Sequence, residues 1–102
     1  MKKIMLSGAI VLLFGLYSKA QQTSAEYLKI AMDKLNAKDY DGAISYFNEA
    51  EAASKGKDSS VFYNRGIAKL NLKRKEEACA DFKKAKEHGY KEADKKITES
   101  CK

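Results

Sequence analysis

The chain is poor in the residues that break or bend helices. It has no proline and no tryptophan, and after residue 20 its glycines are confined to positions 42, 56, 66 and 89. Runs of β-branched residues are also absent beyond that point, where alanine, lysine and glutamate are abundant. Because proline and glycine are the residues least compatible with a helix interior, this composition predicts an all-helical protein.

Residues that carry catalytic or metal chemistry are equally scarce. A structural zinc site uses four ligands, whereas this chain has one histidine, His88, and two cysteines. Ser59 and Ser60 are typical of a helix start, and no base with an orienting partner lies near them in sequence. A glycine-rich phosphate loop is also missing. We therefore expect no enzymatic activity, no cofactor and no metal site.

The first 20 residues have the layout of a secretory signal peptide. Lys2 and Lys3 precede an uncharged, mostly apolar run over 4–17, and Ser18 and Ala20 are small residues at the positions that a signal peptidase recognises. A membrane-spanning helix needs roughly 20 apolar residues, so an uncleaved anchor is the weaker alternative. We predict cleavage after Ala20, a domain over 21–102, and a bacterial protein that is periplasmic or secreted.

Cleavage would also change the net charge. The whole chain has 20 basic and 14 acidic residues, a net charge of +6. Without Lys2, Lys3 and Lys19 the basic residues number 17, and the net charge is +3. A mildly basic surface of mixed sign is ordinary for a water-soluble domain. We expect no nucleic-acid partner for an exported protein, and contact with a membrane only through the signal segment before cleavage.

One residue pattern occurs twice, with a separation of 35. The matched pairs are Tyr27 with Phe62, Ala31 with Gly66, Leu35 with Leu70, Ala43 with Ala78, Phe47 with Phe82, and Ala50 with Ala85. Within each copy, steps of three and four place small and aromatic residues on one helix face. Small residues let two helices approach closely while the aromatic rings fill the space beside them, so the pattern predicts two helical hairpins.

This pattern resembles the tetratricopeptide repeat, whose first helix carries an aromatic, an aliphatic and a small residue, and whose second carries alanine, an aromatic and alanine. Those slots hold Tyr27, Ile30, Ala31, Ala43, Phe47 and Ala50 in one copy, and Phe62, Arg65, Gly66, Ala78, Phe82 and Ala85 in the other. The resemblance implies an all-α solenoid, with repeat one over about 24–57 and repeat two over about 59–89. A covering helix over about 91–101 is expected to shield the last hairpin.

Capping signals place the helix ends. Thr23 with Glu26 forms a capping-box pattern, and Asp39 is suited to cap the second helix. Asp58 or Ser59 is expected to start the third helix, and Gly89 to end the fourth in a left-handed conformation.

Two departures from the repeat pattern stand out. Arg65 occupies an aliphatic slot, so we expect its stem to pack and its charged head to reach water. The turn over 73–75 lacks the aspartate cap that Asp39 gives the first turn, so the helix after it is expected to fray at its start. Glu76 and Glu77 partly compensate, because they lie near the positive end of the helix dipole.

The resemblance also implies a binding surface on the inner face of the first helices. It would be lined by Leu28, Lys29, Met32, Leu35 and Asn36 in the first copy and by Tyr63, Asn64, Ile67, Leu70 and Asn71 in the second. Asn64 matches an asparagine that bonds a ligand backbone in such repeats. An apolar groove with amide edges suits an extended or helical peptide, so the expected partner is another protein or peptide of unknown identity. Packing of this stripe within the protein itself, or against a second copy in a homodimer, is the alternative.

The two cysteines, Cys79 and Cys101, lie at equal distances from residue 90, in the expected turn between the last two helices. Equal distances from the turn of an antiparallel hairpin bring two residues level. Exported proteins meet an oxidising compartment, so we predict a disulfide, with two half-buried free thiols as the alternative.

Basic residues gather late in the chain, at Lys73, Arg74, Lys75, Lys83, Lys84, Lys86, Lys91, Lys95 and Lys96. Acidic residues such as Glu76, Glu77, Glu87 and Glu92 are interspersed among them, as on an ordinary solvated face. The alternative function is contact between this basic face and an anionic envelope polymer or lipid surface.

Overall fold

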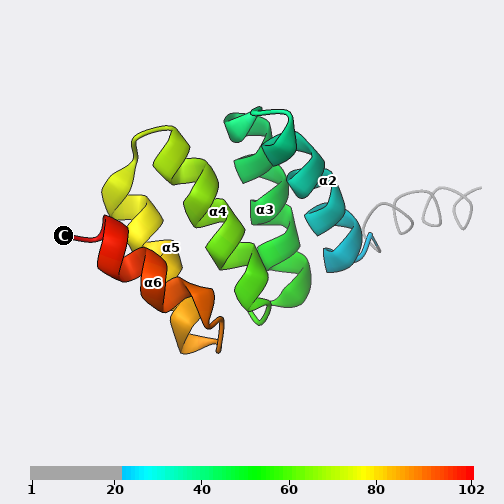
Figure 1. Cartoon of the computed structure of the whole chain (residues 1–102). Coiled ribbons are helices and arrows are strands. Elements are labelled where there is room, and N and C mark those ends of the chain that lie inside the picture. The colour runs from blue at the N-terminus through cyan, green and yellow to red at the C-terminus, as the bar shows by residue number, and fades with distance from the viewer. Residues whose placement is uncertain (1–21) are drawn as a thin grey trace, which may run out of the picture.

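The computed structural model describes residues 22–102, which form five helices packed one against the next (Figure 1). They are α2 (Ser24–Asn36), α3 (Tyr40–Ser54), α4 (Ser59–Asn71), α5 (Lys75–Glu87) and α6 (Glu92–Ser100). Each helix contacts its neighbour in sequence, and the α2–α3 and α4–α5 pairs are the most extensive. The all-helical prediction is confirmed. The predicted signal segment, 1–20, lies outside the described residues.

The helix starts follow the predicted caps. The Thr23 side chain accepts a hydrogen bond from the Glu26 amide, and the Glu26 side chain reaches back, which completes the capping box of α2. Asp39 accepts from the Gly42 amide at 3.0 Å and caps α3, and Asp58 caps α4. Arg74 precedes α5 with no side-chain cap, as the sequence predicted. Three of these four helix starts are therefore fixed by side chains.

The turns inside the two helix pairs have the same backbone form. Lys38 and Lys73 adopt φ values of 63° and 62°. The amide after each lysine donates to a carbonyl five residues earlier, from Asp39 to Lys34 and from Arg74 to Lys69, both at 2.9 Å. Because these bonds satisfy the last carbonyls of α2 and α4, each pair closes in a tight left-handed turn.

The core lies along the predicted stripes of small and aromatic residues. One buried cluster comprises Ala31, Ala43, Phe47, Ala50, Val61 and Ala68, and so joins α2, α3 and α4. In the second pair, Ala78, Phe82 and Ala85 are fully buried. Gly66 lets α4 approach α5 closely, because a Cβ atom there would lie 2.6 Å from Cε1 of Phe82. The alanine–aromatic pattern of the sequence is thus the pattern of the core.

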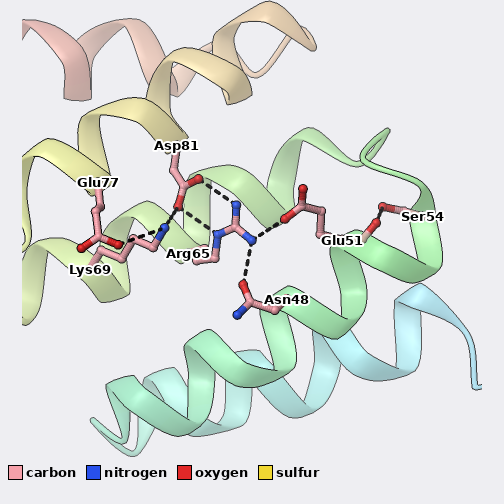
Figure 2. Close-up of polar contacts among 7 residues, drawn as sticks. All are labelled: Asn48, Glu51, Ser54, Arg65, Lys69, Glu77 and Asp81. Carbon is pink, nitrogen blue, oxygen red and sulfur yellow. Dashed lines mark hydrogen bonds and ion pairs between the residues drawn. The ribbon is translucent and has the colours of Figure 1, made fainter.

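Arg65 corrects a prediction: its charged head does not reach water. Its side chain is 9% exposed and forms a two-pronged pair with Asp81, from Nε at 2.9 Å and from Nη2 at 2.8 Å (Figure 2). Its Nη1 donates to Asn48 at 2.8 Å and to Glu51. Burial disfavours the charged form, but the bonds to Asp81 and Glu51 outweigh it and raise the pKa of Arg65 above its ordinary value. The prediction failed because its partners come from two other helices, α3 and α5.

The last helix is held by a disulfide and a small apolar contact. Cys79 of α5 and Cys101 are bonded, with their Cα atoms 5.7 Å apart, which confirms the predicted pairing. Ala93 of α6 is fully buried beside Phe62 and Ala85. Helix α6 therefore packs at the end of the helix row, where a covering helix was expected.

Candidate functional site

The first helices of the two pairs, α2 and α4, also contact each other, so they share one side of the helix row. We use the term inner face for the residues predicted there on α2 and α4: Leu28, Lys29, Met32, Leu35, Asn36, Tyr63, Asn64, Ile67, Leu70 and Asn71. Seven of them are partly buried, and Lys29, Asn36 and Asn71 are exposed. None of the ten is fully buried, so every one retains some surface for contact.

On α2, apolar side chains form the middle of the inner face. Leu28, Met32 and Leu35 are partly buried and pack against the cluster around Phe47. One side of each of these side chains therefore packs against the core, while the other side is exposed to solvent. Lys29 adds an exposed positive charge beside this stripe.

On α4, two amides flank the apolar residues Ile67 and Leu70. The Asn64 side-chain amide donates to the Ser60 carbonyl, and Asn71 donates to the Ile67 carbonyl, each at 2.9 Å. Each amide group is thus held by its own helix one turn back. An amide fixed in this way presents its remaining hydrogen-bonding groups in a defined direction.

Tyr63 is the inner-face residue with the most contacts to other aromatic rings. Its ring stacks on Tyr90 with centroids 4.5 Å apart, and lies 5.7 Å from the Phe82 ring in a tilted arrangement. Burial, followed by the nearby Tyr90, Glu92 and Glu99, raises the pKa of the Tyr63 phenol. Burial likewise raises the pKa of Tyr90, with Glu92 and Asp58 adding to it.

Sequence reasoning missed Tyr90, because it lies in the turn after Gly89 and outside both copies of the pattern. An aromatic residue directly after a helix-ending glycine was the available signal. It brings a second ring to the α4 part of the inner face.

The net charge differs between the first two helices and the last three. Residues 22–58 contain five basic and seven acidic residues, a net charge of −2, whereas residues 59–102 contain twelve basic and seven acidic residues, a net charge of +5. A shallow depression of about 390 Å³ beside the disulfide is lined by Lys75, Lys83 and Lys102, together with Glu76. The basic residues predicted as one face thus include a local cluster at the α5–α6 end.

Residues 22–102 hold no group of three or more metal-binding side chains. Across the same residues, no helix combines the length and the apolar character needed to cross a membrane. His88 stacks on the Phe62 ring with centroids 5.6 Å apart, at the end of α5.

Comparisons with known protein families, with curated proteins and with solved structures give no match to this chain.

Proposed function

We propose that the two helix pairs are tetratricopeptide-type repeats and that the inner face binds a peptide or a segment of another protein. The single observation that supports this most is the apolar stripe formed jointly by α2 and α4, with Met32 and Ile67 at matched positions. Both side chains are only partly buried, although both are apolar. A stripe of this kind, edged by fixed amides, offers apolar contacts for the side chains of a bound peptide and hydrogen-bonding groups for its backbone.

The proposed ligand is a short apolar segment with a free backbone edge. Leu28, Met32, Ile67 and Leu70 offer contacts for its apolar side chains, while Asn64 and Asn71 offer amide groups for its backbone. Two helix pairs provide only a short apolar stripe, so we expect modest affinity for a single segment. We propose a role as an adaptor or assembly factor, in which a second contact on the partner adds to the binding.

We place this activity outside the bacterial cytoplasm. The signal-like segment over 1–20 is one support, and the Cys79–Cys101 bond is the other, since disulfides persist in oxidising compartments. We therefore propose that the protein is a binding module that acts in the periplasm or is secreted.

The direct test begins with a displayed library of random peptides, from which those that bind the chain from Gln21 to Lys102 are selected. Selected peptides are then measured by calorimetry against the Ile67→Lys variant, which puts a charge into the stripe. Ser45→Lys is the matched control, because it adds the same charge at an exposed position of α3. We expect Ile67→Lys to weaken binding at least about tenfold and Ser45→Lys to leave it unchanged. Equal affinities for both variants would place the binding site elsewhere.

A second candidate function is supported by the charge division. The +5 half of the chain and the lysine cluster at the α5–α6 end favour contact with an anionic envelope polymer or lipid surface. Such binding would fall steeply with added salt, and Lys75→Gln with Lys83→Gln would weaken it. Peptide binding at the apolar stripe would change little under the same salt increase.

A further inference from the structure

Tyr63, which is predicted to contact a ligand, is covered by the chain itself. Tyr90 stacks on its ring with centroids 4.5 Å apart. Directly after Tyr90, Ala93 of α6 packs into the cluster that contains Phe62 and Ala85. The α4 part of the inner face is therefore partly occupied by the segment that leads into α6.

Helix α6 has few attachments of its own. It is nine residues long, its N-cap residue Lys91 makes no side-chain cap bond, and Ala93 is its one fully buried residue. Its ion pair between Asp94 and Lys86 of α5 is exposed, with side chains 66% and 58% accessible. Isolated helices of this length are unstable in water, and exposed ion pairs add little.

The disulfide is the strongest link between α6 and the rest of the chain. It joins Cys101, directly after α6, to Cys79, which is 9% exposed on α5. Helix α5 itself does not depend on this bond, because Ala78, Phe82 and Ala85 bury it against its neighbours. Opening the bond would free the weakly attached helix and leave the firmly packed one in place.

We propose that Tyr90 and α6 form a removable cover over the α4 part of the inner face, locked by the Cys79–Cys101 bond. A dithiol reductant opens the lock: it transfers two electrons and two protons to the disulfide, two cysteine thiols form, and the dithiol becomes a disulfide itself. Release of α6 leaves Tyr90 held by the hydrogen bond from its amide to the Ala85 carbonyl of α5, at 2.9 Å, so its ring can move off Tyr63 and lengthen the apolar stripe that Ile67 and Leu70 begin. This inference rests on the proposed function of the inner face, and it identifies how access to that face is regulated.

Hydrogen exchange on the ligand-free chain from Gln21 to Lys102, with and without dithiothreitol, tests the lock. We expect the amides of α6 to exchange about a hundredfold faster after reduction, while those of α2, α3 and α4 keep their protection. Unchanged exchange in α6 would overturn the proposal. A uniform loss of protection in all five helices would also overturn it, because the bond would then stabilise the whole domain.

Nitration by tetranitromethane tests the cover on a variant without thiols, Cys79→Ser with Cys101→Ser. We expect Tyr63 to be nitrated several-fold faster in this variant than in the disulfide-bonded chain, and Tyr46 of α3 to react at an equal rate in both. If α6 is released and Tyr63 keeps its slow reaction, the cover does not exist. Both measurements are made without any peptide, so failure of the proposed peptide binding would leave their outcome readable.

Discussion

The α2–α3 pair and the α4–α5 pair share one spacing, but matched positions in them use different chemistry. Ile30 and Tyr46 in the first pair correspond to Arg65 and Asp81 in the second, so an apolar combination is replaced by a buried ion pair. Arg65 and Asp81 are buried, whereas Ile30 and Tyr46 are only partly buried. The comparison teaches that a shared spacing of 35 residues does not determine what kind of contact matched side chains make.

The ion pair also does something that the apolar combination does not, because it links three helices. Arg65 of α4 contacts Asp81 of α5 and reaches Asn48 and Glu51 of α3, and Lys69 adds a contact to Asp81 at 3.0 Å (Figure 2). The network thus crosses the boundary between the two pairs. We interpret it as a polar contact that, together with the apolar cluster around Phe47, fixes how the second pair sits against the first.

The largest expected change in stability comes from giving the second pair the apolar residue that the first pair has at the matched position, Ile30. Arg65→Ile leaves Asp81 buried without its main partner, so we expect the free energy of unfolding to fall by about 3–5 kcal/mol. Urea unfolding followed by circular dichroism measures this. Adding Asp81→Leu removes the stranded carboxylate and should restore at least about 2 kcal/mol. A loss below about 1 kcal/mol for Arg65→Ile would mean that the head of Arg65 reaches water in solution.

The next largest change in stability is expected at the small residue in the first helix of each pair, which is Ala31 in α2 and Gly66 in α4. Gly66→Ala would place a Cβ atom 2.6 Å from Cε1 of the fully buried Phe82, so the ring must shift. We expect a net loss of about 1–2 kcal/mol in thermal unfolding, even though alanine favours the helix more than glycine does. The reciprocal change Ala31→Gly should cost about 1 kcal/mol through helix propensity and about a further 1 kcal/mol through loss of the buried methyl group. A more stable Gly66→Ala variant would contradict the tight packing of α4 on α5.

Substitutions at the starts of α3 and α5 are expected to change stability by a smaller amount, with a loss in the first pair and a gain in the second. Asp39 and Arg74 are matched residues with similar backbone angles, φ −87° and ψ 79° against φ −95° and ψ 66°. Asp39→Ala should cost about 1 kcal/mol, because the Gly42 amide loses its acceptor. Arg74→Asp should gain about 0.5–1 kcal/mol by capping α5, since the exposed pair that it removes, with Asp41, contributes little. Chemical denaturation of both variants checks the two signs, and a destabilised Arg74→Asp variant would show that the turns are not equivalent.

The smallest expected effect is a pH dependence of stability that arises from Tyr63 of α4 and Tyr90 in the turn before α6. The pKa values of Tyr63 and Tyr90 are raised above 10.0 in the folded chain, chiefly by burial. Their contribution to stability is therefore complete below pH 10.0 and is lost as the pH rises above it, because the unfolded chain deprotonates first. The variant with Tyr63→Phe and Tyr90→Phe should lose less stability between pH 9 and pH 11 than the native chain. Equal losses would indicate that neither phenol is shielded.

Much of this architecture was accessible from the sequence because its signals are local. The capping box at Thr23, the cap at Asp39 and the left-handed Gly89 depend on residues within one turn, and all three were predicted correctly. The pairing of Cys79 with Cys101 followed from their symmetric distances around a turn.

The failures concern contacts between residues far apart in sequence. Arg65 forms hydrogen bonds with Asn48 and Asp81, which are 17 and 16 residues away in sequence, and no local pattern predicts these bonds. The stacking of Tyr90 on Tyr63 was missed for the same reason. For the inner face, the sequence predicted its residues through a resemblance, and which of them contact a ligand stays a prediction.

The most direct test of the central claim is a titration of the ¹⁵N-labelled chain, Gln21 to Lys102, with a selected peptide, followed by amide chemical shifts. Binding at the inner face predicts the largest shifts at Leu28, Met32, Ile67 and Leu70, and small ones at Lys75 and Lys83. Shifts confined to the lysine cluster beside the disulfide would contradict peptide binding at the inner face and would favour the basic face instead.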